Sequence, residues 1–382
     1  MVNREGDESV GRGAAPTRVL QVTGSLRAGG AETMVMNLYR KLDRSLVQFD
    51  FLVFDEEIGT FESEVNELGG KVIRIGPLRG RGYRESCRAI AQEIRSHGPY
   101  QVVHSHLNLA SAAVVQGAWG ENVPVRVAHS HTTRDGDQLG GQRSKQAFAR
   151  LLIRRFANRY VACGEDAGRH LFGNAWKRGS VLPNAVDLER FVHQDVTDAI
   201  TLRTAHGVPA DALLVGSVAR LGSAKNLDFV IDLAEQVVRT SEVYFWIVGD
   251  GPDRERLESR VHRSDLTDRV QFLGMRTDIP AVLLALDALL MPSLYEGLPV
   301  SVIEAQAAGT LSLVSDRVTR EVDLGLGLVE YLSLERPDIW QDSILRLKAG
   351  GTKTDTRELL SESDYNAANA VELVLRLYGL EA

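Results

Sequence analysis

The sequence has only two cysteines, Cys87 and Cys163, and their spacing fits neither a metal site nor a redox pair. This scarcity excludes a disulfide-stabilised secreted domain and suits a reducing cytoplasm. Long apolar runs are also missing, since the stretch nearest to a membrane-spanning length, residues 281–291, is too short and contains Asp287. Residues 1–15 mix charges with glycine and lack the apolar segment of a signal peptide, so we expect a disordered tail there.

Short-period repeats and low-complexity segments are absent as well, and the composition is that of an ordinary globular protein. The 382 residues are 44% hydrophobic and 25% charged, and this length allows two or three domains. The net charge of −7 is unevenly distributed: residues 16–190 hold 24 basic against 18 acidic side chains, and residues 191–382 hold 18 against 30. The asymmetry indicates two domains that face different partners; the alternative is an uneven scatter of solvated surface charge.

Apolar strand patterns alternate with amphipathic helix patterns, and the series restarts near the middle of the chain. We expect strands at residues 18–23, 49–54, 72–75, 102–104, 125–129, 160–163, 213–218, 245–248, 270–273, 288–292 and 311–315. Such alternation builds parallel sheets with helices on both faces. We therefore predict an α/β fold of two Rossmann-like, doubly wound domains facing a cleft, with a ligand beyond the carboxyl ends of the strands. The expected domains are 16–183 and 184–366, followed by a helix at 367–382 that could cross back to the first domain.

Two glycine-rich loops follow expected strands. Gly29 and Gly30 lie in the loop after the first strand, where the backbone can approach a ligand and the free amides near Ala31 and Glu32 favour an anion. The segment 249–252, Gly-Asp-Gly-Pro, follows another strand. Neither loop is a P-loop or a full dinucleotide fingerprint, so each could equally be an ordinary tight turn.

A pair of cations occupies the loop after the strand at 213–218. Arg220 and Lys225 lie at the carboxyl end of that strand, and Asn226 is a suitable N-cap for the next helix. Two cations facing the cleft can neutralise a diphosphate, and each charge-assisted hydrogen bond contributes about 1.5–3 kcal/mol. The alternative is two solvated surface cations, although the chain contains only seven lysines.

The segment 292–305 carries the strongest signal. Pro299 suits the first position of a helix, and the free amides of Val300 and its neighbour would then point into the cleft. Glu296 lies just outside the helix start and Glu304 one to two turns inside it. Carboxylates at these places could accept hydroxyl groups of a sugar and of a ribose; the alternative is one helix-capping and one solvated carboxylate.

Together these motifs resemble the retaining glycosyltransferases of family four, over about residues 16–332. The residues that carry the resemblance are Gly29-Gly30-Ala31-Glu32, His131-Thr132, Pro183-Asn184-Ala185-Val186-Asp187, Arg220 with Lys225, Gly249-Asp250-Gly251-Pro252, and Glu296 with Glu304. Segments 315–323 and 328–334 are similar to the exopolysaccharide and capsule branch of that family. The resemblance implies the two-Rossmann-domain fold called GT-B.

The resemblance also implies roles for individual residues. Arg220 and Lys225 match the pair that binds the donor diphosphate and stabilises the leaving group. Glu296 matches the carboxylate near the donor sugar, and Glu304 the carboxylate on the ribose. The resemblance implies that sugar and phosphate contact the backbone of four consecutive residues, Gly297, Leu298, Pro299 and Val300.

Further roles follow at the first domain. Gly29 and Gly30 match the loop that approaches donor phosphates and acceptor, and His131 matches the histidine near the transferred sugar. The sequence departs from the family at Pro299, where many members have glycine, and at Ala185, where glycine is usual. These departures put the fine donor geometry in doubt.

Three other histidines compete with His131. His129 lies two residues earlier on the same face of an extended segment, and His104 and His106 form a similar pair. Each could also be a structural histidine of the core.

We therefore expect a retaining glycosyltransferase that moves a hexose or N-acetylhexosamine from a UDP-linked donor to a hydroxyl of a saccharide, lipid-linked saccharide or small natural product. No cofactor, metal or nucleic-acid partner is expected, and Asp135 and Asp137 are interpreted as a turn. The alternatives are a sugar-nucleotide epimerase of the same fold and an inactive nucleotide-sugar binding protein. A dinucleotide oxidoreductase is a further alternative, but it lacks its glycine fingerprint.

A basic helix is expected at 143–159, with Phe148, Leu151, Leu152 and Phe156 at helical spacing among six cations. A second basic run holds Arg79, Arg81, Arg84 and Arg88. One interpretation is a core-facing helix with a solvated basic side. The other is contact with an anionic membrane, which would make the enzyme cytoplasmic and peripheral on the inner face of the membrane.

Overall fold

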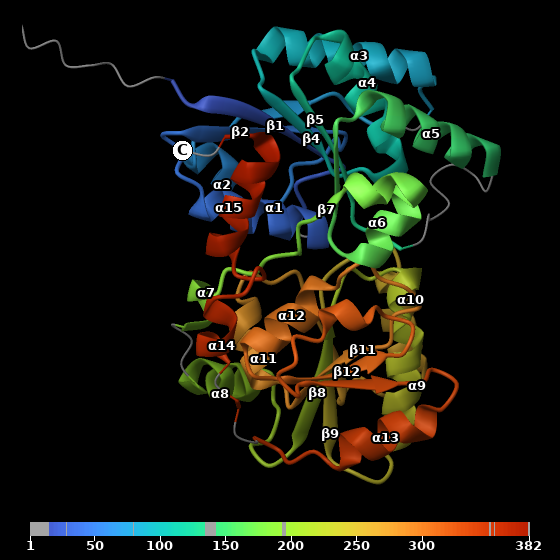
Figure 1. The fold of residues 1–382 in the computed structure, drawn as a ribbon. Coiled ribbons are helices and arrows are strands. Elements are labelled where there is room, and N and C mark those ends of the chain that lie inside the picture. The colour runs from blue at the N-terminus through green and yellow to red at the C-terminus, as the bar shows by residue number, and fades with distance from the viewer. Residues whose placement is uncertain are drawn as a thin grey trace, which may run out of the picture.

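The computed structural model describes residues 15–27, 29–78, 80–133, 143–192, 196–350, 353–354 and 356–380. The expected tail at 1–14, Arg79, Asp135 and Asp137 lie outside the described residues. Within them the chain forms two parallel sheets, of seven and six strands, stacked as an upper and a lower domain (Figure 1). No helix of this described part is both long and apolar enough to cross a membrane.

The first sheet has the strand order β3-β2-β1-β4-β5-β6-β7. Its strands are β1 (Thr17–Thr23), β2 (Val47–Val53), β3 (Val72–Arg74), β4 (Val102–Ser105), β5 (Val125–Ser130), β6 (Arg159–Ala162) and β7 (Ser180–Val181). Helices cover both faces because the strands are apolar on both sides. These helices are α1 (Gly30–Lys41), α2 (Glu62–Glu67), α3 (Tyr83–His97), α4 (Ser111–Gly120), α5 (Arg143–Phe156) and α6 (Glu165–Phe172).

The second sheet has the order β10-β9-β8-β11-β12-β13. Its strands are β8 (Leu213–Val218), β9 (Val243–Val248), β10 (Val270–Gly274), β11 (Ala288–Met291), β12 (Leu311–Ser315) and β13 (Val329–Leu332). The helices along this part of the chain are α7 (Glu189–Val192), α8 (Val196–Ala205), α9 (Leu227–Val237), α10 (Arg254–Arg263), α11 (Ile279–Ala285), α12 (Val300–Ala307), α13 (Pro337–Leu345) and α14 (Arg357–Ser361). The predicted α/β class with two doubly wound sheets is confirmed.

Strand order reverses at the β1/β4 pair of the first sheet and at the β8/β11 pair of the second. In doubly wound sheets the loops diverge to opposite faces at such a reversal and leave a crevice beyond the strand ends. The loops after β1, β8 and β11 carry the glycines, the cations and Glu296 that the sequence singles out. The topology therefore brings these segments to one place.

The last helix, α15 (Ala367–Tyr378), packs against α1 of the first domain, beside β2 (Figure 1). The two segments that pass between the domains are bonded to each other, because Val186 N–H donates to the Tyr365 carbonyl at 2.8 Å and Ala367 N–H to the Val186 carbonyl at 3.0 Å. Asn37 of α1 also donates to the Ala185 carbonyl, at 2.9 Å. The crossing is thus a short hydrogen-bonded ladder and not a loose linker.

Two local predictions are wrong in detail. Asn226 precedes α9 but adopts the left-handed conformation, with φ 52°, and its side chain makes no capping bond. Instead it donates to the Pro292 carbonyl at 3.2 Å, which ties the loop after β8 to the end of β11. Pro299 is the N-cap of α12 and not its first residue, because its ψ of 111° is extended.

Candidate functional site

One cavity of about 690 Å³ lies between the two domains, lined by loops that follow strands of both sheets. All eleven residues that the sequence singles out for the site line it: Gly29, Gly30, His131, Arg220, Lys225, Glu296, Gly297, Leu298, Pro299, Val300 and Glu304. The volume suits a ligand of the size of a nucleotide sugar. Residues that are far apart in the sequence, from Gly29 to Glu304, therefore line the same cavity.

The two predicted cations differ in their partners. Lys225 is held on a 3₁₀ turn after β8, and its Nζ lies 2.5 Å from Oε1 of Glu296. Arg220 is exposed and forms no ion pair with any residue that the structure describes. Among the described residues, the cavity thus presents one guanidinium that makes no direct ion pair, that of Arg220, and one ammonium, that of Lys225, whose carboxylate partner is on the adjacent loop. An anionic ligand can be shared between both cations.

Helix α12 points its first turn at the same wall. Pro299 at the N-cap offers no N–H, and the amides of Val300 and Ser301 lack partners inside the helix. The partial positive charge of a helix start favours a phosphate or a developing negative charge. The α12 terminus therefore adds to the field of Lys225 and Arg220.

Two carboxyl groups that line the cavity have raised pKa values, Glu304 as a buried residue and Glu32 as a half-buried one. Glu304 is 7% exposed, and burial raises its pKa to about 7, while the charge of Arg190 acts in the opposite direction. Burial likewise raises the pKa of Glu32 to about 7, opposed by its own backbone amide and by Arg220. Both groups change charge near neutral pH, which makes them suited to accept hydroxyl groups when ionised.

The domains meet at the floor of the cavity. A Cβ atom on Gly297 would overlap the carbonyl of His131, so only glycine permits this approach of the loop after β11 to the end of β5. Thr133 donates to the Glu296 carbonyl at 2.6 Å, and Asn184 donates to the Leu298 carbonyl at 2.6 Å. These contacts fix His131 relative to the start of α12.

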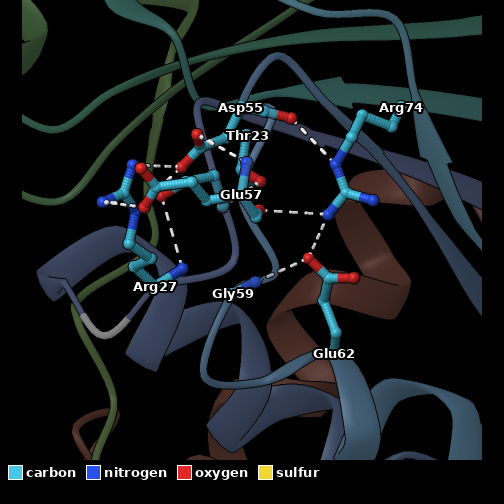
Figure 2. Close-up of polar contacts among 8 residues, drawn as sticks. Thr23, Arg27, Asp55, Glu57, Gly59, Glu62 and Arg74 are labelled. Carbon is cyan, nitrogen blue, oxygen red and sulfur yellow. Dashed lines mark hydrogen bonds and ion pairs between the residues drawn. The ribbon is translucent and has the colours of Figure 1, made fainter.

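A polar cluster braces the loop that carries Gly29 and Gly30 (Figure 2). Arg27 binds Asp55 through Nε at 2.8 Å, and Arg74 donates to the carbonyls of Asp55 and Glu57 at 2.8 and 3.2 Å. Arg74 also pairs with Glu62, whose carboxylate accepts from the Gly59 amide at 2.6 Å. The loop after β1 is thereby tied to the loop after β2.

Behind His131 lies a group of histidines. His104 lies in β4 and His129 in the neighbouring parallel strand β5, and His106 and His131 are the residues directly after these strands. His106 Nδ1 lies 2.9 Å from His131 Nε2, and His104 Nε2 lies 3.1 Å from His129 Nδ1. In the sequence, any of these four histidines could be the one near the transferred sugar. Of the four, only His131 lines the cavity in the structure. Each of two consecutive expected strands carries a His-x-His pair at its end. This pattern could have predicted that the four histidines lie close together.

Nitrogen atoms of His104, His106 and His129 lie within 4.8 Å of one another, the distance range of a metal-binding group. Asp135 and Asp137, interpreted as a turn, are not among the described residues. Three further cavity residues were not anticipated as ligands: Arg190, Arg276 and Asn184. Arg190 lies in α7 and Arg276 in the loop after β10, and neither belongs to a motif that would reveal it.

The family description "Glycosyltransferase Family 4" matches residues 28–190, and "Glycosyl transferases group 1" matches residues 198–322. The putative glycosyltransferase EpsF of Bacillus subtilis (strain 168) is 38% identical over 95% of this chain and 96% of its own length. Over about a third of the chain, 2-deoxystreptamine glucosyltransferase of Streptomyces kanamyceticus is 37% identical, with 36% of each protein covered. UDP-Gal:alpha-D-GlcNAc-diphosphoundecaprenol alpha-1,3-galactosyltransferase of Escherichia coli is 33% identical over the same shares of 36%.

Among solved structures, Anabaena Alr3699/HepE in complex with UDP and glucose superposes with a TM-score of 0.72. The match covers 94% of this chain and 95% of that one at 20% identity, and it shows a shared fold. The predicted GT-B architecture and the predicted resemblance are thus confirmed. Because the likeness to EpsF runs through nearly the whole of both proteins, the chain belongs to the family-four glycosyltransferases, which transfer sugar from a nucleotide-sugar donor.

Proposed function

We propose that the protein transfers a hexose or N-acetylhexosamine from a UDP-linked donor to a hydroxyl of a saccharide, with retention of the anomeric configuration. The observation that carries this proposal is the joint placement of Arg220, Lys225, Glu296 and Glu304 on one cavity wall beside the start of α12. In the proposed complex the diphosphate lies on the two cations, the ribose on Glu304 and the transferred sugar between Glu296 and His131.

The proposed reaction breaks the bond between C1 of the sugar and the diphosphate oxygen. The acceptor hydroxyl oxygen forms a bond to C1 on the same face, and its proton passes to the departing phosphate oxygen. Negative charge grows on the diphosphate in the transition state, where preplaced cations and helix amides stabilise it most. Pairing of Glu296 with Lys225 supports a role for this carboxylate in holding charge and sugar and not as a nucleophile.

We further propose that the acceptor is presented at an anionic membrane surface. On α5, Ala149 and Ile153 are buried in the core, but the side chains of Phe148 and Leu151 are 54% and 56% exposed. The apolar residues of this helix therefore do not all face the core. Tyr83, 37% exposed, contacts Phe148 edge-on at 6.2 Å between ring centroids, so α3 extends the same surface. Exposed cations accompany these side chains: Arg84, Arg88, Arg143, Lys145, Arg154 and Arg155. Aromatic side chains among cations are typical of an interfacial surface.

The activity is tested by incubating the protein with a panel of nucleotide sugars, with and without bacterial membrane lipids, and measuring released nucleoside diphosphate. Release from a UDP-sugar, with product that retains the anomeric configuration by NMR, is expected. A sugar epimer formed without acceptor would instead identify an epimerase, and binding without release in any mixture would identify a binding protein.

Membrane contact has its own test, sedimentation with vesicles that contain anionic lipid. Each interfacial cation contributes about 1 kcal/mol, so we expect binding at low salt that the double change Arg154→Glu and Arg155→Glu weakens. A matched control carries the same charge change on two exposed arginines of the second domain, Arg239→Glu and Arg263→Glu. Absence of binding at low salt would favour a soluble acceptor.

A further inference from the structure

The start of helix α6 lies at the boundary between the two domains. This helix begins at Glu165, on the edge of the first domain that faces the second (Figure 1). Its N-cap is Gly164, which has no side chain, so the helix has no side-chain capping bond of its own. The backbone amides of the first turn have no partners inside the helix and need partners from elsewhere.

A carboxylate of the second domain supplies that partner. Oε2 of Glu321 accepts a hydrogen bond from the backbone N–H of Glu165 at 2.8 Å, and Oε1 accepts from that of Asp166 at 3.3 Å. A Cβ atom on Gly164 would lie 2.5 Å from Oε2 of Glu321, so the missing side chain makes room for the carboxylate. Glu321 is thus a cap for α6 that comes from the other domain, and the positive end of the helix attracts it.

Glu321 is held in place by its own domain. It lies in the 3₁₀ turn Arg320–Val322, and Thr319 bonds both its backbone N–H and its carboxylate, each at 3.3 Å. The Tyr365 hydroxyl donates to the Glu321 carbonyl at 3.0 Å. Because the Tyr365 carbonyl accepts from Val186, the turn is also connected to the segments that cross between the domains.

Two acidic side chains in the first turn of α6 could repel this carboxylate. However, Oε2 of Glu165 lies 3.0 Å from Arg169 and 3.0 Å from Nε1 of Trp176. Asp166 pairs with Arg169 at 3.6 Å. Both acidic side chains are therefore bound to partners within the first domain, and the backbone amides remain available to Glu321.

The capped helix is connected to the candidate site through the end of β5. The Ser130 hydroxyl donates to the Ala167 carbonyl of α6 at 2.8 Å, and Ser130 directly precedes His131, which lines the cavity. The second domain contacts this unit at two points, because Gly297 lies against the His131 carbonyl and Glu321 caps α6. Two contacts fix an orientation that a single contact would leave free to rotate.

We propose that Glu321 is a positioning residue that fixes the first domain on the second, so that His131 faces the wall where the donor binds. The charged side chains proposed for the donor nucleotide, Arg220, Lys225 and Glu304, all belong to the second domain. Loss of the cap should therefore leave UDP binding little changed and impair the transfer step, which needs both domains. This consequence for transfer rests on the proposed function, whereas the cap between the domains does not.

Hydrogen–deuterium exchange tests the cap without any donor. In Glu321→Ala we expect the backbone amides of segment 163–172 to exchange at least about 10-fold faster, because the first turn loses its partner. Glu321→Gln keeps an acceptor oxygen and should restore part of the protection. The control Glu330→Ala removes a carboxylate whose partners, Ser343 and Arg346, both lie in the second domain, and it should leave this segment unchanged.

The same experiment tests whether the cap fixes the domains. If it does, exchange in Glu321→Ala should also rise in segments 130–133 and 296–299, which meet across the boundary at Gly297. A rise confined to 163–172 would show that Glu321 stabilises α6 alone, and it would overturn the positioning role. Unchanged exchange in all three segments would overturn the cap as well.

A second variant disturbs the same contact from the first domain. In Gly164→Ala the added Cβ displaces the carboxylate of Glu321, while Glu321 itself remains. We expect this variant to resemble Glu321→Ala and the double variant to be no worse than either one, since both changes break one contact. Fully additive effects would contradict a shared contact. Gly82→Ala is the matched control, because Gly82 is also the N-cap of a first-domain helix and its added Cβ meets no atom within 4 Å.

Kinetics and calorimetry test the consequence for transfer. We expect kcat to fall about 10-fold in Glu321→Ala and in Gly164→Ala, since misplacing one side of a reacting centre is costly. The affinity for UDP should stay close to that of the unmodified protein. Normal kcat in both variants would overturn the positioning role. Because exchange is measured without donor, a protein that is inactive in every transfer assay would contradict the proposed function and leave the exchange results standing.

Discussion

Lys225 lines the cavity at the place where we propose that the donor diphosphate binds, and its ammonium group pairs with Glu296 at 2.5 Å. Replacing Lys225 or Arg220 by alanine removes one preorganised cation from the transition state. We expect each change to lower transfer by about 10²–10³-fold. The measurement is the rate of nucleoside diphosphate release, alongside the melting temperature.

The control for these two changes is Arg336→Ala, which removes an exposed cation of the same domain that pairs with Asp338. Folding should survive all three changes, since the altered side chains face the cavity or solvent. Near-normal turnover in Lys225→Ala or Arg220→Ala would show that the diphosphate lies elsewhere.

The buried carboxyl group of Glu304 makes the stability of the folded protein depend on pH. Burial raises its pKa to about 7 from 4.5, so the folded state keeps a proton that the unfolded state loses. This contribution to stability is complete below pH 4.5 and is lost as the pH rises to about 7. Above that pH the ionised group costs on the order of 3 kcal/mol. Glu304→Gln should therefore raise the melting temperature more at pH 8 than at pH 4.5.

The same carboxyl group links donor binding to pH. If ribose hydroxyls donate to ionised Glu304, UDP has to displace the proton below pH 7 and its affinity should fall there. Calorimetric titrations of UDP at pH 6 and pH 8 measure this, and Glu304→Gln should remove the difference. A UDP affinity in the unmodified protein that is equal at the two pH values would contradict the ribose assignment.

At the residue scale, the side chains that the sequence singled out lie on segments that follow strands. Arg220 and Lys225 follow β8, Glu296 follows β11 and His131 follows β5, and all four line the cavity beyond the carboxyl ends of the strands, where parallel sheets gather their ligands. Gln21, whose side chain bonds His106 behind the cavity, gave no such signal, because it lies inside β1 and its polar side chain is buried at 1% exposure. A buried polar residue inside a strand becomes meaningful only when its partners are known.

At the scale of elements, the loop before α12 and the end of β5 act as one unit. The contact depends on Gly297, where any Cβ would overlap the His131 carbonyl. We expect Gly297→Ala to separate the two loops and to lower kcat/KM by at least about 10², since small misplacements at a reacting centre are costly. Activity and thermal unfolding are measured together.

The matched control is Gly120→Ala, at the end of α4, where an added Cβ meets no atom within 4 Å. It should leave both activity and melting temperature close to those of the unmodified protein. Full activity in Gly297→Ala would mean that the loop can move without consequence for the site.

Element boundaries were predictable where apolar patterns decide them. The strands at 213–218 and 311–315 have the expected bounds, because both are buried on two faces. Helix starts were less predictable: Asn226 was expected to cap α9, yet a tertiary bond to Pro292 holds its side chain. Capping preference is worth about 1 kcal/mol, and one competing hydrogen bond can offset it.

At the scale of the whole molecule, the two sheets form an upper and a lower domain, and the last helix returns to the first domain (Figure 1). The cavity is lined by residues of both domains. The alternation of strands and helices predicted this architecture. The bond between Tyr378 and His104 joins residues 274 positions apart, and no local pattern reports such a pairing. The contact of the last helix with the histidines behind the cavity could therefore not be predicted from the sequence.

At the scale of the whole reaction, we propose that protein groups alone stabilise the leaving diphosphate. In this proposal, Lys225, Arg220 and the start of α12, which all line the cavity, supply the positive charge that a divalent ion would otherwise provide. The most direct test is the rate of sugar transfer from the UDP-linked donor in excess EDTA. We expect a rate equal to that without chelator. Loss of transfer with EDTA, restored by magnesium or manganese, would contradict it.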